Sequence, residues 1–353
     1  MIKYLRLLLF PFSIGYGIVI VLRNKLYDLG LFKSTRFDIP VICVGNLVVG
    51  GSGKSPVTEY LVSLLSDHKI AILSRGYGRK TKGFILADES ATAQTIGDEP
   101  MQFYSKFKQI TVAVCEDRVT GINRLKDSHD LIILDDAYQH RSVTPGFSIL
   151  LFEYQKLLSP QFLLPAGNLR EPFSGYKRAQ ALLITKGPIV IAEGERLKCV
   201  ERFNEKAKNE LSFSFITYGE LKHLFSSATQ PCASITSNTT VFLLTGIANP
   251  LPLINYLKTY SGAIQHHDYP DHYHFRMQDV MKLVQAFNND PSKEKIIVTT
   301  EKDAQRLLDV SFKELLLNLP VFYLPIKIEL QKEDKNTFDQ KILDYVSSTT
   351  RNR

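Results

Sequence analysis

The amino-terminal part of the chain holds a long apolar stretch with basic flanks. Residues 7–22 carry no charge, and Pro11, Gly15 and Gly17 interrupt them. The stretch is shorter than the roughly 20 apolar residues that a membrane-spanning helix needs. The pattern predicts a helix in the membrane interface, where flanking lysines and arginines meet anionic headgroups. A hydrophobic first helix packed on the core is the alternative.

Short apolar, β-branched runs alternate with helical patterns along the rest of the chain. The run 39–44 leads into a glycine-rich loop, and residues 56–65 after this loop have apolar positions at helical spacing. Further runs predict strands at 70–73, 110–114, 131–134, 148–152, 181–185, 241–244, 296–298 and 321–324. Such alternation is typical of a mostly parallel sheet covered on both faces. The sequence therefore predicts an α/β fold.

A polar connection separates two series of predicted strands. Residues 226–240 are rich in Ser and Thr, and the preceding segment 193–208 is highly charged. The 353 residues exceed one average domain. We expect a boundary near residue 220. The predicted division is an interfacial helix (1–30), a core domain (31–220) and a smaller C-terminal α/β domain (221–353).

The composition favours a protein that handles anions without wrapping nucleic acid. Lys and Arg number 43 against 36 Asp and Glu, and the net charge is +7 with no run of five basic residues. A mild, dispersed excess fits phosphates or anionic lipid headgroups better than an arm on nucleic acid. The four cysteines lie far apart with no CxxC pair, which is typical of free thiols in a reducing cytoplasm.

Residues 50–55 have the sequence Gly-Gly-Ser-Gly-Lys-Ser between a predicted strand and a predicted helix. Glycines let backbone N–H groups turn toward phosphate oxygens, Lys54 supplies a cation, and the Ser55 hydroxyl can bind Mg²⁺. Val48 stands where the full pattern has its first glycine, so the loop is a variant. A glycine-rich turn that caps a helix is the alternative. The predicted nucleotide site comprises Gly50, Gly51, Ser52, Gly53, Lys54 and Ser55.

Two acids, Asp135 and Asp136, follow the predicted strand 131–134. Ligands of doubly wound sheets gather at the carboxyl ends of the strands, and an acid there can hold Mg²⁺. Since successive strand residues face opposite sides, one acid can reach the metal while the other polarises a substrate hydroxyl. Gln139 and His140 follow at once. A solvated Asp-Asp turn is the alternative.

Three further polar segments are candidates for the same cleft. Residues 74–79 form a glycine-arginine loop after a predicted strand, residues 97–100 form a compact acidic turn, and residues 300–303 follow another strand. Each is a weak signal alone, and 74–79 also fits a surface turn. Together with the phosphate loop they predict the rims of one site for anions and a metal.

Residues 266–274 hold four of the eight histidines, with Asp268 and Asp271. His and Asp are zinc ligands, so a GTP-dependent metal chaperone is a second hypothesis for the whole chain. Against it, the segment has no nearby cysteine or standard spacing, and the chain has no Asn-Lys-x-Asp guanine-reading motif. A plain polar loop is a third possibility. We favour a histidine that supports a catalytic acid from across the domain cleft.

Seven motifs in this order resemble the tetraacyldisaccharide 4'-kinase, or lipid A 4'-kinase, family. They are VGNLVVGGSGKSP (44–56), SRGYGR (74–79), GDEP (97–100), DDAYQH (135–140), LLPAGNLREP (163–172), DYPDHYHF (268–275) and TTEKDA (299–304). The departures are few. Ala137-Tyr138 stands where Gly-Phe is usual, Asn168 replaces a common proline, and Ser52 and Ser55 replace threonines.

The resemblance implies transfer of the γ-phosphate of ATP to the 4'-hydroxyl of a tetraacyl glucosamine disaccharide 1-phosphate, which forms the lipid A precursor lipid IVA. It implies two α/β/α domains with the cleft between them and a requirement for ATP and Mg²⁺. The expected location is peripheral, on the cytoplasmic face of the bacterial inner membrane. We expect an anionic membrane surface as partner, a monomer, and no nucleic acid.

The family's residue roles carry over to this sequence through the matching motifs. Asp136 is the implied catalytic base, oriented by His272, and Lys54 contacts the phosphates. The implied metal and phosphate shell comprises Ser55, Asp98, Glu99, Asp135, Gln139 and Glu171. The predicted substrate-binding residues are Ser74, Arg75, Tyr77, Asn168 and Arg170.

Overall fold

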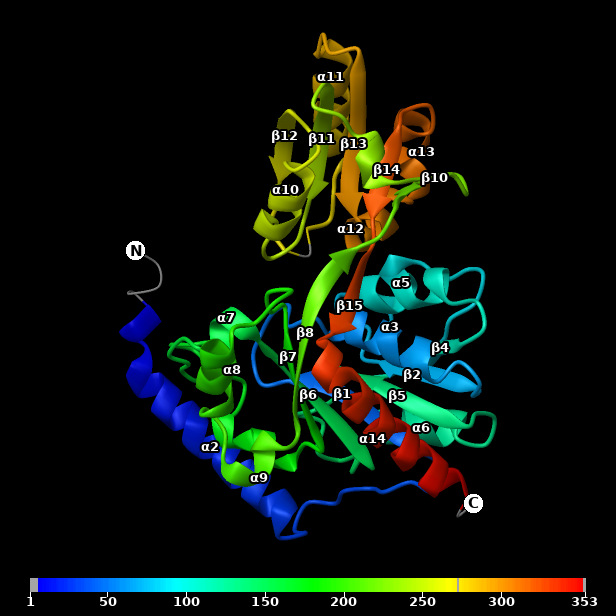
Figure 1. Cartoon of the computed structure of the whole chain (residues 1–353). Helices are drawn as coiled ribbons and strands as arrows, with labels where there is room; N and C mark the ends of the chain where they lie inside the picture. The colour runs from blue at the N-terminus through cyan, green and yellow to red at the C-terminus, as the bar shows by residue number, and fades with distance from the viewer. Residues whose placement is uncertain (1–5, 272, 352–353) are drawn as a thin grey trace.

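The computed structural model describes residues 6–271 and 273–351. His272, the predicted partner of the catalytic base, lies outside these described residues. The chain forms two α/β units, each built around its own sheet, and Figure 1 shows the smaller unit stacked above the larger one. The predicted α/β class with a mostly parallel first sheet is confirmed.

Nine strands form the larger sheet, in the order β15-β8-β7-β6-β1-β5-β2-β4-β3. Seven of them run parallel: β1 (Val41–Asn46), β2 (Ile70–Ser74), β4 (Thr111–Val114), β5 (Leu131–Asp135), β6 (Phe147–Glu153), β7 (Ala181–Thr185) and β8 (Leu211–Tyr218). The two edge strands, β3 (Ile85–Leu86) and β15 (Ile326–Leu330), are antiparallel to their neighbours. Strands β1, β2, β5 and β7 are buried throughout, as expected for a sheet covered on both faces.

Helices cover both faces of this sheet. One core packs α3 (Lys54–Leu64), α5 (Asp98–Lys106) and α14 (Lys332–Arg351) against the sheet, through residues such as Leu61, Phe103 and Phe338. The opposite core packs α6 (Arg118–Leu125), α7 (Tyr154–Leu157) and α8 (Glu193–Val200). Short helices complete the unit: α4 (Ala93–Ile96), α9 (Glu205–Lys208) and the 3-10 helix η1 (Phe173–Arg178).

The smaller unit contains a six-stranded sheet in the order β10-β9-β14-β13-β11-β12. Its strands are β9 (Leu221–His223), β10 (Thr229–Gln230), β11 (Thr239–Thr245), β12 (Ala263–Asp268), β13 (Glu294–Thr300) and β14 (Val321–Leu324). Its helices are η2 (Cys232–Ser234), α10 (Leu251–Leu257), α11 (Met277–Asn289), α12 (Glu301–Leu307) and α13 (Val310–Leu316). The predicted strands at 241–244, 296–298 and 321–324 all lie within this sheet.

The carboxyl-terminal end of the chain departs from the expected division. Residues 326–351 return to the larger unit, where β15 pairs with β8 and α14 packs on the sheet. Figure 1 shows β8 and β15 side by side where the chain passes between the units, and the Gly219 N–H donates to the Pro325 carbonyl there at 2.9 Å. The reason is local: Phe338, Ile342 and Val346 recur every four residues and bury one face of α14.

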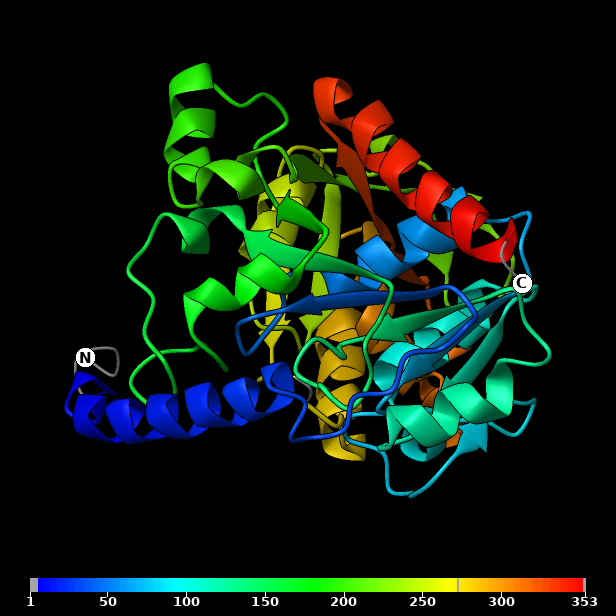
Figure 2. The same cartoon turned by 90° about the horizontal axis from the view of Figure 1, so that it is seen from below.

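The amino-terminal helix α2 (Phe10–Asp28) lies along the larger unit (Figure 2). Most of its apolar side chains are exposed to solvent. It contacts the protein through small and polar residues. The Ser13 hydroxyl donates to the Leu163 carbonyl at 3.0 Å, and a Cβ on Gly17 would come within 2.7 Å of Leu163. The large side chains of Phe12 and Ile18 are 67% and 64% exposed. The alternative of a first helix that buries its apolar face in the core is therefore not supported.

None of the helices in the described residues combines the length and the apolar character needed to cross a membrane.

Candidate functional site

The predicted site loops follow neighbouring parallel strands of the larger sheet. Strand β1 ends at the phosphate loop, β5 ends at Asp135, and β2 ends at Ser74. The register pairs Val44 with Asp135 and Leu73 with Leu134. Because parallel strands present their carboxyl ends at one edge, the sheet itself brings these loops together.

Hydrogen bonds from the ends of two strands, β1 and β7, hold the phosphate loop in place. The Asn46 side-chain amide donates to the Ser52 hydroxyl at 2.7 Å and to the Gly50 carbonyl at 3.2 Å. The Thr185 hydroxyl at the end of β7 donates to the Ser52 carbonyl at 2.8 Å. Gly50 and Gly53 have φ angles of 106° and 86°, which only glycine adopts readily, and Gly53 begins helix α3. The loop thus leads into the positive end of a helix, as phosphate binding requires.

The two adjacent acids occupy opposite electrostatic environments. Burial raises the pKa of Asp135 to about 7, with Glu99 and Asp136 adding to the effect. Burial would also raise the pKa of Asp136, but Lys54 and Arg170 hold it below its ordinary value. The Lys54 ammonium lies 3.7 Å from Asp136 Oδ1, and Arg170 Nη1 lies 3.0 Å from the same atom. Asp136 is therefore ionised at neutral pH.

The surroundings of Asp135 fit a divalent cation. Its Oδ2 accepts a hydrogen bond from the Ser74 hydroxyl at 3.2 Å, whereas its Oδ1 is buried without a hydrogen-bond partner. In the described residues, no three His, Cys, Asp or Glu side chains form a group that could hold a metal by themselves. Mg²⁺ commonly binds one or two carboxylates together with phosphates and water, so one unpaired carboxylate oxygen beside a phosphate loop is a suitable donor set.

Gln139 and Glu171 meet in the site but are already engaged with protein donors. The Gln139 amide donates to Glu171 Oε1 at 3.0 Å and to the Asn46 carbonyl at 2.8 Å. The other oxygen of Glu171, Oε2, accepts from Arg178 at 2.8 Å and from Asn24 at 3.2 Å. These hydrogen bonds connect the end of β1, the 135–140 loop and helix α2. It favours a positioning role for both residues over the predicted metal ligation.

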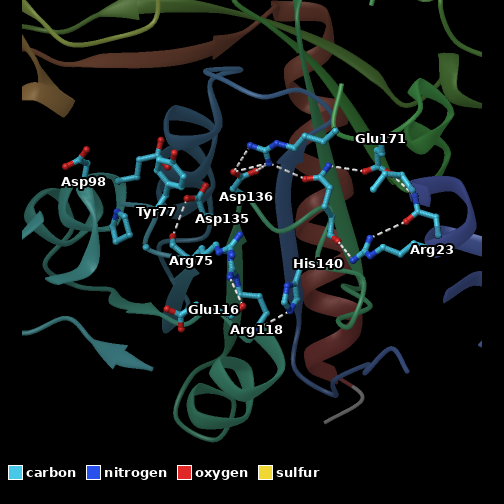
Figure 3. Close-up of a pocket in the computed structure, with 18 of the residues that line it drawn as sticks. Arg23, Arg75, Tyr77, Asp98, Glu116, Arg118, Asp135, Asp136, His140 and Glu171 are labelled. Carbon is cyan, nitrogen blue, oxygen red and sulfur yellow. Dashed lines mark hydrogen bonds and ion pairs between the residues drawn. The ribbon is translucent and has the colours of Figure 1, made fainter. Parts of the chain in front are cut away.

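A cavity of about 560 Å³ lies in front of the acids (Figure 3). Its lining includes ten of the predicted residues: Ser74, Arg75, Tyr77, Asp98, Glu99, Asp135, Asp136, Gln139, Arg170 and Glu171. Asn168 does not line this cavity. Its side-chain oxygen accepts from Arg6 at 3.0 Å instead, so the structure places it beside the amino-terminal helix.

The cavity also contains residues that sequence reasoning did not assign to the site. They include Tyr16 and Arg23 from α2, together with Glu116, Arg118 and His140. Arg118 is buried, and its Nε atom has no hydrogen-bond partner. Arg23 follows the apolar stretch directly, and this position predicts a headgroup contact, whereas the structure places the side chain at the cavity wall. Arg118 carried no signal, because only the fold brings the loop after β4 to this place.

The smaller unit reaches the same site through Arg306 of α12. Arg306 Nε donates to Asp98 Oδ2 at 3.0 Å, and Arg306 Nη1 donates to Asp303 Oδ1 at 2.8 Å. Asp303 is itself held by the Gly246 N–H at 2.9 Å and by the Thr300 hydroxyl at 2.7 Å. The three charged side chains of Asp98, Arg306 and Asp303 are all buried. The 300–303 segment thus contributes to the cleft by supporting Asp98.

A second buried ionic contact joins the same two helices. The Lys106 ammonium of α5 lies 2.6 Å from Glu59 Oε2 and 3.0 Å from Glu301 Oε2. Lys302 adds longer contacts, at 4.0 Å to Glu99 and 3.9 Å to Asp271. The two units therefore meet through charged side chains on one edge of the cleft.

Comparison with known proteins decides the family. The family model described as tetraacyldisaccharide-1-P 4'-kinase matches residues 5–347. The chain belongs to this kinase family. The membership that the seven motifs predicted is thereby confirmed, and the hypothesis of a GTP-dependent metal chaperone is not supported.

Relatives named tetraacyldisaccharide 4'-kinase are similar to this chain over nearly its whole length. The protein from Flavobacterium psychrophilum is 44% identical and covers 99% of both chains. The protein from Bacteroides thetaiotaomicron is 42% identical, over 98% of this chain and 94% of its own. A crystal structure of LpxK from Aquifex aeolicus, described as an "apo" form in complex with ATP, matches with a TM-score of 0.74. It is 31% identical and covers 97% of this chain and 99% of its own.

In this kinase, we expect the Arg306→Met variant to lose turnover out of proportion to its loss of stability. The substitution removes the donor that fixes Asp98 at the cavity wall, and a misplacement of about 1 Å can cost up to roughly 100-fold in rate. We expect kcat to fall by at least about 10-fold, with partial rescue in Arg306→Lys.

The matched control is Lys106→Met, which removes the ionic contact between Lys106 of α5 and Glu301 of α12 but leaves the partner of Asp98 in place. Steady-state kinetics and thermal melting of all three variants provide the comparison. Equal losses of kcat in Arg306→Met and Lys106→Met would mean that Arg306 only holds the two units together.

Proposed function

We propose that this protein transfers the γ-phosphate of ATP to the 4'-hydroxyl of a tetraacyl glucosamine disaccharide 1-phosphate, and so forms lipid IVA. One observation carries the proposal. The phosphate loop, the ionised Asp136 and a cavity partly walled by the apolar helix α2 lie together. A kinase for a lipid acceptor needs these three features in contact. The printed names of the relatives support the same reaction.

The nucleotide's phosphates are proposed to lie on the loop 50–55 at the start of α3. Lys54 is buried and close to Asp136, so its charge is available to the phosphate that moves. The residues proposed to hold Mg²⁺ are Asp135, through its unpaired oxygen, and Ser55. Mg²⁺ held there would supply positive charge to offset the negative charge of the phosphates during transfer.

Asp136 is proposed to accept the proton of the 4'-hydroxyl. Its carboxylate is ionised, and Arg170 holds it with distances of 3.0 and 3.3 Å from Nη1 to the two oxygens. Asp136 has a left-handed backbone conformation, with φ 48°, which is uncommon for a non-glycine residue and occurs often at active sites. Phosphoryl transfer depends chiefly on positioning and charge neutralisation, and base assistance adds roughly 10²–10⁴-fold. His272 remains the proposed partner that orients this base.

The arginines of the cavity are proposed to bind the substrate's own phosphate. Arg75 and Arg118 line the cavity, and Arg23 enters it from α2 (Figure 3). The unpartnered Nε of buried Arg118 can donate to an oxygen acceptor. Burial and the neighbouring Arg118 lower the pKa of His140, so this side chain is neutral near pH 7 and does not add to the positive charge.

Helix α2 is proposed to anchor the kinase peripherally on the cytoplasmic face of the inner membrane. Its exposed apolar side chains and basic ends fit an interface rich in anionic lipid. Tyr16 and Ile20 of the same helix line the cavity. Acyl chains in the membrane and the sugar in the cavity can therefore be contacted at once. The mild net charge of +7 supports the proposal that the protein does not bind nucleic acid, and a monomer stays a prediction.

The proposed reaction and base are tested together in one assay with radiolabelled ATP and the disaccharide 1-phosphate lipid. The wild type should give a product labelled at the 4' position. Asp136→Asn should lower kcat by at least about 100-fold, because the amide cannot take the proton. ATP binding, measured separately by calorimetry, should remain. Near-normal turnover of the variant would exclude Asp136 as the base.

The pKa of Asp135 predicts a pH dependence of Mg²⁺ binding. Below about pH 7 the carboxyl group is protonated and a poor ligand, so affinity for Mg²⁺ with ATP bound should rise from pH 6 to pH 8. In Asp135→Asn this rise should be absent. The comparison of the two proteins cancels the titration of ATP itself. An identical pH profile in both would argue against Asp135 as a metal ligand.

The anchoring role of α2 predicts a selective effect of polar substitutions on its exposed side. We expect Phe12→Ser/Ile18→Ser to reduce partition onto anionic vesicles by about 10-fold and to raise the apparent KM for lipid, with the KM for ATP unchanged. Leu251→Ser is the matched control, since Leu251 is 61% exposed on α10 of the smaller unit. Unchanged vesicle partition in the α2 variant would refute the anchoring role.

A further inference from the structure

The cavity in front of Asp135 and Asp136 contains a carboxylate that no step of the proposed reaction uses. Glu116 lies two residues after the end of β4 and lines the cavity together with Arg75 and Arg118 (Figure 3). Its side chain is 43% exposed, so a ligand can reach it. Binding of a phosphate accounts for the arginines of this wall, but it does not account for an acid among them.

The Glu116 carboxylate is held in place by a buried arginine. Arg79, whose side chain is 3% exposed, donates from Nη2 to Glu116 Oε1 and to the Gly83 carbonyl, the latter at 2.7 Å. The Gly83 N–H donates to Glu116 Oε2 at 3.0 Å. The slight burial of Glu116 raises its pKa, but the hydrogen bonds from Arg79 and Gly83 lower the pKa below its ordinary value. The group is therefore ionised at neutral pH.

The backbone that carries Glu116 is fixed as well. The Cys115 N–H donates to the Ser74 carbonyl at 3.0 Å, which continues the pairing of β2 with β4 by one residue. Arg118 Nη1 donates to the Cys115 carbonyl at 2.8 Å and to the Glu116 carbonyl at 3.2 Å. Because its backbone and its carboxylate are both held, Glu116 is preorganised at the cavity wall before a ligand binds.

An ionised carboxylate in this place favours a neutral hydrogen-bond donor as its ligand. A carboxylate has about four acceptor sites and no donor, so Glu116 can accept a further hydrogen bond beside those from Arg79 and Gly83. An ionised phosphate has no hydrogen to donate, and two like charges in contact repel each other. The sugar hydroxyls of the proposed lipid acceptor are neutral donors of the required kind.

We propose that Glu116 recognises the sugar of the lipid acceptor by accepting a hydrogen bond from one of its hydroxyl groups. Arg79 is a positioning residue, which acts through Glu116 and does not contact the substrate. This inference rests on the proposed function for the identity of the acceptor, but it divides the cavity wall into two kinds of contact. The arginines bind the phosphate of the lipid, and the fixed carboxylate binds its sugar.

A different role for Glu116 would be to offset the positive charge of Arg75 and Arg118. In that role its removal strengthens the binding of every lipid that carries a phosphate, because a repulsive charge is lost. In sugar recognition, its removal weakens the binding of a lipid with a sugar and spares a lipid without one. Phosphatidate separates the two roles, since it has acyl chains and a phosphate but no sugar.

Steady-state kinetics at saturating ATP, with phosphatidate as a competitive inhibitor, provides the test. In Glu116→Ala we expect the KM for the disaccharide lipid to rise by about 10-fold, the usual effect of losing one hydrogen bond to a charged group. The kcat and the KM for ATP should stay the same, and the KI of phosphatidate should stay the same or fall. Glu116→Gln keeps an oxygen acceptor and should recover part of the loss. Glu89→Gln is the matched control, since Glu89 is an exposed acid outside the cavity lining.

A double-variant cycle tests the positioning role of Arg79. Arg79→Met should also raise the KM for the lipid, because it releases the Glu116 carboxylate. Added to Glu116→Ala, it should change this KM little further, since the group that Arg79 positions is already absent. Effects on KM that simply add would mean that Arg79 does not act through Glu116. Thermal melting of each variant shows whether it is folded.

The outcomes for Glu116 are distinct from those for the reaction itself. An unchanged or lower KM for the lipid in Glu116→Ala would overturn the inference. Equal factors of change in the KM of the lipid and the KI of phosphatidate would overturn it too, and in both cases the wild-type reaction would stand. If the wild type does not phosphorylate the disaccharide lipid, the proposed function fails, and no variant is needed to see that.

Discussion

The ionic contact between Lys54 and Asp136 is the interaction on which the proposed site depends. Lys54 comes from the phosphate loop after β1, and Asp136 follows the adjacent strand β5, so the contact exists only because these strands are neighbours. It holds the phosphate-binding cation beside the proposed base. The contact also gives the two adjacent acids different pKa values. Lys54 and Arg170 lower the pKa of Asp136 and keep it ionised, whereas burial raises the pKa of Asp135. One strand end thereby supplies the proposed base and a proposed metal ligand.

Around this contact, the larger unit receives support from parts of the chain that are distant in sequence. Arg306 of the smaller unit binds Asp98, and Gln331 of the carboxyl-terminal return pins the loop after β7. Because both supports are buried side chains, the positions of the two units and of the carboxyl-terminal helix bear directly on the geometry of the site. Polar groups that leave water must find partners, so such contacts are specific.

The amino-terminal helix α2 contacts residues of the proposed site on one side and exposes apolar side chains to solvent on the other. Arg23 and Asn24 bind the Gln139 carbonyl and Glu171, while the opposite side of the helix remains apolar and exposed. Small residues make this possible, since Ser13 and Gly17 allow the helix to approach residue 163 without burying its large side chains. A helix that packed through its large side chains would leave no apolar surface for a lipid interface.

The sequence by itself determined the α/β class, the positions of nine strands, the phosphate loop and the kinase family, but it did not predict strands such as β8, β12 and β15. These features depend on local periodicity, on glycines at positive φ and on short motifs, all of which are contiguous in the chain. Only the tertiary structure placed Arg118 and Arg306 at the site and returned residues 326–351 to the first sheet. Only the fold showed Gln139 and Glu171 engaged with protein donors, Asn168 beside the amino-terminal helix, and Glu116 held by Arg79 at the cavity wall. These depend on which strand ends are neighbours and on which side chains fill the space between two units, and no local pattern encodes either.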